Sequence, residues 1–172
     1  MKKLLGGVIL LAVAQGAFAQ FNVEFGASYN ASTGSFSDTH DLGLGFYAEP
    51  SYSFGDFSVL AQMGWIAVDG KGSEAAIIAS SNLTTYLVGA KYTFLNQKIR
   101  PFAGLLGGVY DTEFVEIDRG GSDIVVAVTP AKMGFSPALG LDFDRYSFST
   151  QYHFIEEARF IQLKAGVRLF KR

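Results

Sequence analysis

Apolar and polar residues alternate strictly along most of the chain after residue 20. In the last such run, apolar residues at 161, 163, 165, 167 and 169 alternate with Gln162, Lys164, Gly166 and Arg168. A repeat of two residues is that of a β-strand with one apolar and one polar face. Eight such runs lie at about 21–30, 42–54, 57–67, 83–94, 99–110, 134–143, 146–154 and 160–169. They predict an all-β, antiparallel protein.

The connections between these runs alternate in length. Short turns follow the second, fourth and sixth runs, at 55–56, 95–98 and 144–145. Connections at 31–41, 68–82, 111–132 and 155–159 follow the other runs, and the first three of these are long. With an even number of strands, both chain ends lie on the short-turn side, as in outer-membrane barrels. We predict a closed, up-and-down, eight-stranded transmembrane barrel with both termini periplasmic.

Alternation alone does not say which face is inside. A lipocalin-like barrel in water has its apolar residues inside, whereas a transmembrane barrel has them outside. The less apolar face carries many Gly, Ser and Ala residues, which suit a narrow lumen. Aromatic residues also gather beside the short turns, as in an interfacial girdle: Phe21, Tyr52, Phe54, Phe57, Tyr92, Phe94, Phe143, Tyr146 and Phe148. Both features favour the transmembrane arrangement.

The first 19 residues have the features of a secretory signal. Lys2 and Lys3 form the charged region, an apolar stretch follows at 4–14, and Ala17-Phe18-Ala19 is a cleavage site. We expect Sec-type export, removal of residues 1–19, and one mature domain over 20–172. The alternative is a segment that stays attached as an anchor.

The composition limits the possible functions. The chain is 49% hydrophobic, with 16 Phe and 8 Tyr, but no apolar run is long enough for a transmembrane helix. There is no Cys, so no disulfide can stabilise an exported fold. Without Lys2 and Lys3, 12 of the 14 basic residues stand against 16 acidic ones. This balance argues against nucleic acid as a partner.

Seven charged residues occupy the predicted inward face: Glu24, Glu49, Lys91, Arg100, Asp142, Lys164 and Arg168. Most of them lie in the half of the barrel nearer the short turns. A buried charge must be paired or hydrogen-bonded, because an isolated ion in a low-dielectric medium is costly. We predict a plug of salt bridges that closes the periplasmic half of the lumen. The alternative is that lumen water solvates each charge separately.

The sequence offers no convincing catalytic or metal site. Only two histidines are present, His40 beside Asp41 and His153 on the inward face. Local spacing places no Ser, Asp or Glu to form a triad with either histidine. There is no H-E-x-x-H motif, so we expect no metal and no cofactor. His153 is interpreted as a structural hydrogen-bonding group.

Two of the long connections contain apolar stretches, at 75–79 and 124–128. Exposed apolar patches often mark partner surfaces. The candidate residues for binding another protein are Ile77, Ile78, Ile124, Val125 and Val126. The second stretch is β-branched and is expected to pair with 114–117 beyond the membrane, where a sheet edge can bind a partner by strand addition. Packing over the barrel mouth is the alternative.

The external connections are strongly acidic. They hold Asp38, Asp41, Asp69, Glu74, Asp111, Glu113, Glu116, Asp118, Asp123, Glu156 and Glu157 against Lys71, Arg119, Lys132 and Arg159. Solubility outside the membrane accounts for this charge. The alternative is that divalent cations bridge these carboxylates to anionic lipid headgroups.

Three segments carry a resemblance to a known family: the glycine-rich run at 100–108, the run at 134–141, and the closing run at 163–170. With the alternation, they make residues 20–172 similar to the eight-stranded outer-membrane proteins that include the OmpA transmembrane domain and OmpX. The resemblance implies a Gram-negative outer membrane, contact with lipopolysaccharide, insertion by the barrel-assembly machinery and a largely filled lumen. It also implies a role in envelope structure, adhesion or partner binding.

The sequence therefore favours a structural or interaction protein over an enzyme. A pore or transport protein for small or hydrophobic solutes is the second interpretation, and bulky Tyr47, Leu106 and Phe160 on the inward face count against it. A lipid-A-modifying enzyme on the same fold is the third. Such an enzyme needs a Ser or His at the outer lipid interface, and the spacing here offers none.

Overall fold

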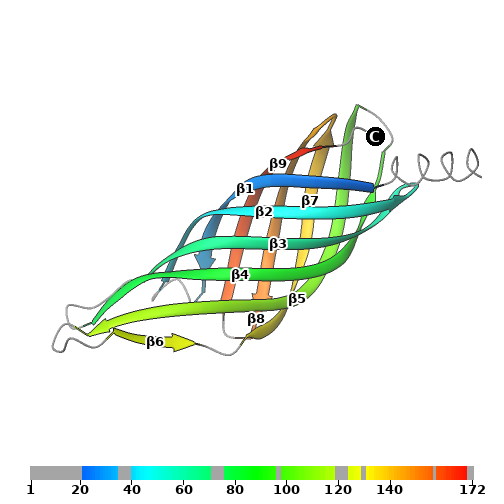
Figure 1. Cartoon of the computed structure of the whole chain (residues 1–172). Coiled ribbons are helices and arrows are strands. Elements are labelled where there is room, and N and C mark those ends of the chain that lie inside the picture. Colours follow the sequence, from blue (N-terminus) through cyan, green and yellow to red (C-terminus); the bar gives the residue numbers. More distant parts are fainter. Residues whose placement is uncertain are drawn as a thin grey trace, which may run out of the picture.

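The computed structural model describes residues 21–34, 40–70, 76–95, 98–118, 124–128, 131–156 and 158–169. Nine strands follow one another within them (Figure 1): β1 Phe21–Thr33, β2 His40–Phe54, β3 Phe57–Gly70, β4 Ala76–Thr93, β5 Ile99–Asp118, β6 Ile124–Val128, β7 Lys132–Phe143, β8 Tyr146–Ile155 and β9 Ala158–Arg168. The expected signal segment and Phe170 lie outside the described residues. In the described ranges, no helix is long and apolar enough to span a membrane.

Eight of the nine strands close into a barrel. The sheet order is β4-β3-β2-β1-β9-β8-β7-β5-β6, and an additional pairing of β4 with β5 completes the ring. Every pairing is antiparallel, and β1 closes on β9 from Glu24 opposite Arg168 to Thr33 opposite Arg159. The predicted eight-stranded, up-and-down barrel is therefore confirmed.

On one side of the barrel, β4 and β5 are longer than the alternation predicted. β4 and β5 extend past the predicted run ends, so that much of 68–82 and 111–132 is strand and not loop. β6 pairs with the far end of β5, from Ile117 opposite Ile124 to Glu113 opposite Val128, as expected for 114–117. Figure 1 shows β4, β5 and β6 reaching beyond the rest of the barrel. Val and Ile favour this extended pairing.

Two of the predicted short turns have the conformation that such turns need. β2 and β3 are joined through 55–56, and β7 and β8 through 144–145. Gly55 has a φ of 64° and Asp144 a φ of 50°, both in the left-handed region. Tight hairpins use this region because it matches the twist of the paired strands.

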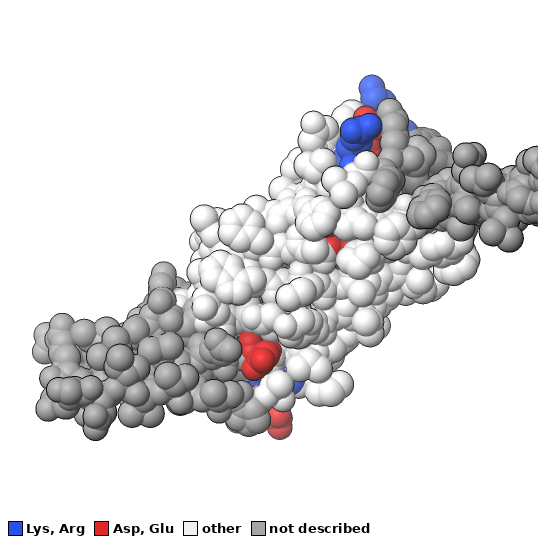
Figure 2. Space-filling view, in the orientation of Figure 1, with Lys and Arg blue, Asp and Glu red and all other residues white. Residues whose placement is uncertain are grey.

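The exterior of the barrel is apolar and the lumen is mostly polar. Exposed side chains include Phe25, Phe46, Trp65, Tyr86, Val88, Leu105, Leu139, Phe148 and Leu163, all at positions predicted to face outward. In Figure 2 the middle of the visible surface is almost entirely white, and the charged side chains gather toward the two ends. Leu42 is an exception, since we expected it outside and it is buried. A register shift between Leu42 and Gly45 reverses its facing.

Large lumen residues lie against glycines of neighbouring strands. A Cβ on Gly26 or on Gly166 would collide with the ring or hydroxyl of Tyr47. A Cβ on Gly140 would collide with the ring of Phe102 and lie 2.6 Å from the backbone oxygen of Phe148. The lumen is so narrow that each of these large side chains needs a neighbouring residue that has no side chain.

We predict that Gly140→Ala destabilises the barrel by about 1–3 kcal/mol, the usual cost of overpacking. Gly107→Ala is the matched control, because its nearest new contact would be an ordinary 3.6 Å from the Gly134 oxygen. Urea unfolding of both variants in lipid vesicles measures the effect. Equal stability of the two variants would show that the contact between Gly140 and Phe102 does not constrain the lumen.

Candidate functional site

Six of the seven predicted inward charges come from five strands and meet in the lumen. Six of the seven side chains are buried: Glu24 of β1, Glu49 of β2, Lys91 of β4, Asp142 of β7, and Lys164 and Arg168 of β9. Most lie close to the ends of strands that lead into short turns. The seventh, Arg100 of β5, is half-buried.

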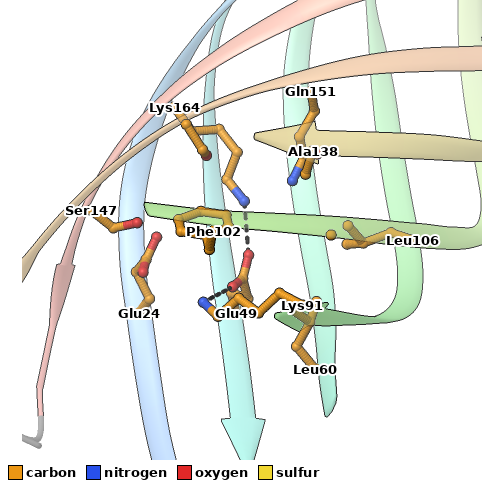
Figure 3. Close-up of a pocket in the computed structure, with 12 residues that line it drawn as sticks. Glu24, Glu49, Leu60, Lys91, Phe102, Leu106, Ala138, Ser147, Gln151 and Lys164 are labelled. Carbon is orange, nitrogen blue, oxygen red and sulfur yellow. Dashed lines mark hydrogen bonds and ion pairs between the residues drawn. The ribbon is translucent and has the colours of Figure 1, made fainter. Parts of the chain in front are cut away.

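The first cluster of charges is centred on Glu49. Lys164 Nζ lies 2.8 Å from Glu49 Oε2, and Lys91 Nζ lies 3.4 Å from Glu49 Oε1 (Figure 3). Lys164 also donates to Gln62 Oε1 at 2.8 Å, and its ammonium group lies 4.0 Å from the centre of the Tyr47 ring. One carboxylate thus binds two ammonium groups, which leaves this cluster with a net charge of +1.

The second cluster of charges is centred on Arg168. Its Nε lies 3.2 Å from Glu24 Oε2, and its Nη2 is paired with Asp142 Oδ1. The Tyr47 hydroxyl donates to Glu24 Oε1 at 2.7 Å, and the Ser147 hydroxyl donates to Asp142 Oδ1 at 3.2 Å. Here one cation binds two carboxylates, so the net charge is −1.

The two clusters are complementary, because three acids and three bases together carry no net charge. Tyr47 joins them, since its hydroxyl binds Glu24 while its ring lies against Lys164. Charges of both signs are thereby paired in a medium that would otherwise penalise each of them. The geometry is that of an interlocked network, in which no single pair stands alone.

Arg100 lies apart from this network. It is directly opposite Asp142 in the pairing of β5 with β7. Asp142 Oδ1 is nevertheless bound by Arg168 and Ser147. Within the described part of the chain, Arg100 takes part in no ion pair, so the structure brings together six of the seven predicted residues.

A small cavity lies between charged side chains of the two clusters. Glu24, Glu49, Lys91, Lys164 and Gln151 are among the residues that line it (Figure 3). The volume open to the centre of a water molecule is about 10 Å³. A cavity of this size holds about one water molecule. The buried Gln151 Oε1 has no protein partner in the described residues and would accept a hydrogen bond from such a water.

A second hydrogen-bonded chain extends from His153 and was not predicted in detail. The Tyr110 hydroxyl lies 2.8 Å from His153 Nδ1, and His153 Nε2 lies 3.3 Å from Gln162 Oε1. Gln162 Nε2 donates to Ser28 at 3.1 Å. A neutral ring, protonated at Nε2, satisfies both contacts of His153. The Phe160 ring stacks on it at 4.1 Å. The inward parity of Tyr110 and Gln162 in the alternation was the signal that could have identified them.

Buried apolar residues also form a core in the lumen. Its buried members are Leu42, Leu60, Ile66, Val68, Leu83, Leu87, Leu106, Tyr110, Ala138 and Phe160. Several of them lie on strand segments that lead toward the long connections. The lumen therefore contains a charged part near the short turns and, beyond it, apolar residues together with buried polar ones such as Asn30, His153 and Gln162.

The residues predicted to bind a partner lie outside the lumen network, on β4 and β6. Ile77 and Ile78 belong to β4, and Ile124, Val125 and Val126 belong to β6. Their side chains, like that of His40, lie outside the described residues. In the described ranges, no group of three or more His, Cys, Asp or Glu residues is arranged to hold a metal ion.

No protein family and no curated protein sequence matches the chain. Solved structures do match. Neisserial surface protein A (NspA) gives a TM-score of 0.60 at 16% identity, over 87% of this chain and 96% of that chain. Ail, the attachment invasion locus protein of Yersinia pestis, gives 0.53 at 15%, over 87% and 97%. The N-terminal β-barrel domain of Pseudomonas aeruginosa OprF gives 0.51 at 15%, over 86% and 97%.

These likenesses establish the fold. The expected resemblance to eight-stranded outer-membrane barrels is confirmed as a resemblance of architecture. Since the identities are 15–16%, they assign no activity or partner to this chain.

We predict that Glu49→Gln lowers the free energy of unfolding by about 3–5 kcal/mol, because it leaves two buried ammonium groups without a carboxylate. Glu156→Gln, at an exposed turn position, removes the same charge and should change stability by less than about 0.5 kcal/mol. Denaturant unfolding in vesicles compares the two. If Glu49→Gln were as stable as Glu156→Gln, the six charges would not act as an interlocked network.

Proposed function

We propose that the protein resides in a bacterial outer membrane, with a structural, adhesive or partner-binding role, and that its ion-pair network closes the lumen. Large apolar side chains exposed around the barrel support a lipid environment, because water would penalise such a surface. In the proposed orientation both termini and the short turns are periplasmic. Insertion by the barrel-assembly machinery and contact with lipopolysaccharide are part of this proposal.

The observation that carries the proposal is the filled lumen. Tyr47, Leu106 and Phe160 have 4%, 3% and 0% of their surface exposed, so they occupy the path that a pore would need. The cavity between the ion-pair clusters has room for about one water molecule. A small pore for polar or hydrophobic solutes is the second candidate. It would require the clusters to separate.

The strand extension supports a role in partner binding. The outer part of β5 lies between β4 and β6, which pairs with β5 and ends the sheet. A strand at a sheet edge offers backbone N–H and C=O groups to an incoming strand. We therefore propose Ile77, Ile78, Ile124, Val125 and Val126 as the partner-binding region. We propose no enzymatic activity for this chain.

The character of the partner follows from the charge of the external connections. Ail has been solved in complex with sucrose octasulfate, a heparin analogue. By the sequence boundaries given above, the external connections of this chain hold 11 acidic residues against four basic ones, Lys71, Arg119, Lys132 and Arg159. A polyanion would be repelled by such a surface. We propose a protein partner, recognised mainly through the strand edge.

The lumen can be tested by single-channel recording of the protein inserted in a planar bilayer. We expect a silent bilayer for the wild type, with insertion verified by protease protection of the barrel. Glu49→Gln, which loosens one ion-pair cluster, should raise the frequency of openings. Steady openings of the wild type would contradict the closed lumen and favour the pore.

The strand edge can be tested by attachment of cells that display the protein to protein-coated surfaces. We expect Val126→Pro to reduce attachment several-fold, because proline removes a backbone donor from β6. Val126→Thr is the matched control, since threonine keeps the β-branch and the donor. Equal attachment of wild type and Val126→Pro, at equal surface amounts, would contradict a role for β6.

A further inference from the structure

Arg159 differs from the other basic residues of the barrel strands. Lys91, Arg100, Lys132, Lys164 and Arg168 all occupy inward positions of the alternation. Arg159 precedes the fully buried Phe160 and is exposed, so its side chain points away from the lumen. Among Lys and Arg in the described strand segments, it is the one cation on the outer face.

Aromatic residues support this arginine. Arg159 is directly opposite Phe154 on β8, and its guanidinium carbon lies 6.0 Å from the centre of the Phe154 ring. Phe135 of β7 stacks on Phe154 at 4.7 Å, and Tyr152 packs against it at 4.6 Å. A cation above an aromatic face is held by the ring quadrupole. The guanidinium thus lies over the Phe154 ring, against which Phe135 and Tyr152 pack.

Hydroxyl groups complete the other side of the site. Thr33 of β1 is directly opposite Arg159 in the pairing with β9. Its Oγ1 lies 3.3 Å from the Tyr152 hydroxyl, and only one hydrogen is shared between the two oxygens. The second hydroxyl hydrogen is not used in this contact and can be donated to an acceptor outside the barrel. One guanidinium and one hydroxyl donor face the same patch of the exterior.

The site lies near the connection between β8 and β9, at the end of the barrel opposite the short turns. A basic residue on the lipid face is costly at the bilayer midplane but tolerated near the interface. The length of the arginine side chain lets its charged group reach the headgroup region. The planar fork of arginine matches the oxygens of a phosphate group, to which it can donate two parallel hydrogen bonds.

We propose that Arg159, with Thr33 and Tyr152, binds the phosphate of a lipid in the outer leaflet. The inference rests on the proposed membrane location and adds the lipid group that is recognised and the residues that bind it. Glu156, in the adjoining turn, is exposed and carries the opposite charge. The negative charge of Glu156 opposes phosphate binding, so Glu156 is not one of the proposed ligands.

Native mass spectrometry of the folded full-length protein in detergent tests the site. The probes are phosphatidic acid and diacylglycerol with the same acyl chains, which differ only by the phosphate. We expect the wild type to bind phosphatidic acid more tightly than diacylglycerol. Arg159→Gln should bind phosphatidic acid about tenfold more weakly than the wild type, because it loses a charge-assisted hydrogen-bonded pair. Arg159→Lys should be intermediate, because it keeps the charge and loses the fork.

Arg145→Gln is the matched control, because it removes an exposed cation at the short-turn end. It should bind phosphatidic acid within about twofold of the wild type. Equal losses in Arg145→Gln and Arg159→Gln would show a general charge effect and overturn the site. Displacement of the lipid by millimolar inorganic phosphate would overturn the lipid as ligand. So would unchanged binding by Arg159→Gln.

Two further measurements keep the inference separate from the proposed function. The intrinsic fluorescence of Trp65 on the exterior reports whether each variant is folded. Phe154→Leu retains the apolar surface, removes the ring under the guanidinium, and should lower affinity less than Arg159→Gln. Wild-type protein that fails to insert into vesicles would contradict the membrane location. Normal insertion together with equal lipid binding by all variants would contradict only the phosphate site.

Discussion

The narrow width of a closed eight-stranded barrel is the constraint on which the rest of the structure depends. Apart from a cavity with room for about one water molecule, side chains fill the interior that the strands leave, so every inward residue must fit its neighbours in volume and in charge. Tyr47 meets both requirements. Its ring occupies space left by Gly26 and Gly166, and its hydroxyl binds Glu24. A wider barrel could solvate such groups in water and would need no complementary arrangement.

The charged and apolar parts of the lumen stabilise it in different ways. The apolar core, which includes the deeply buried Phe160 and Leu87, excludes water through close packing. The charged part is stable only when its partners are placed correctly, because an unpaired ion in the lumen is strongly unfavourable. The first part fills the barrel, and the second is fully paired in the register in which the strands close.

The sequence predicts the strands and their facing because each depends on neighbours one and two residues away. Phe25 and Glu24, for example, take opposite faces of β1 simply by alternation. Strand ends and pairings depend on residues far apart, so they were less predictable. The pairing of 114–117 with β6 was predicted, whereas the pairing of 115–118 with β4 was not, and Leu42 is inward only because β2 and β3 shift register. Alternation likewise places Lys91 in the lumen but cannot say that it reaches across β3 to Glu49.

The pairing of large residues with glycines has a consequence for how such a sequence can diverge. A side chain added at position 166 meets the hydroxyl of Tyr47, and one added at position 26 meets the ring of the same tyrosine. A mutation at one of these three sites therefore alters which residues the other two can accept. Over evolutionary time we expect the three positions to change together, so that related barrels preserve the summed volume of the trio while its individual members drift.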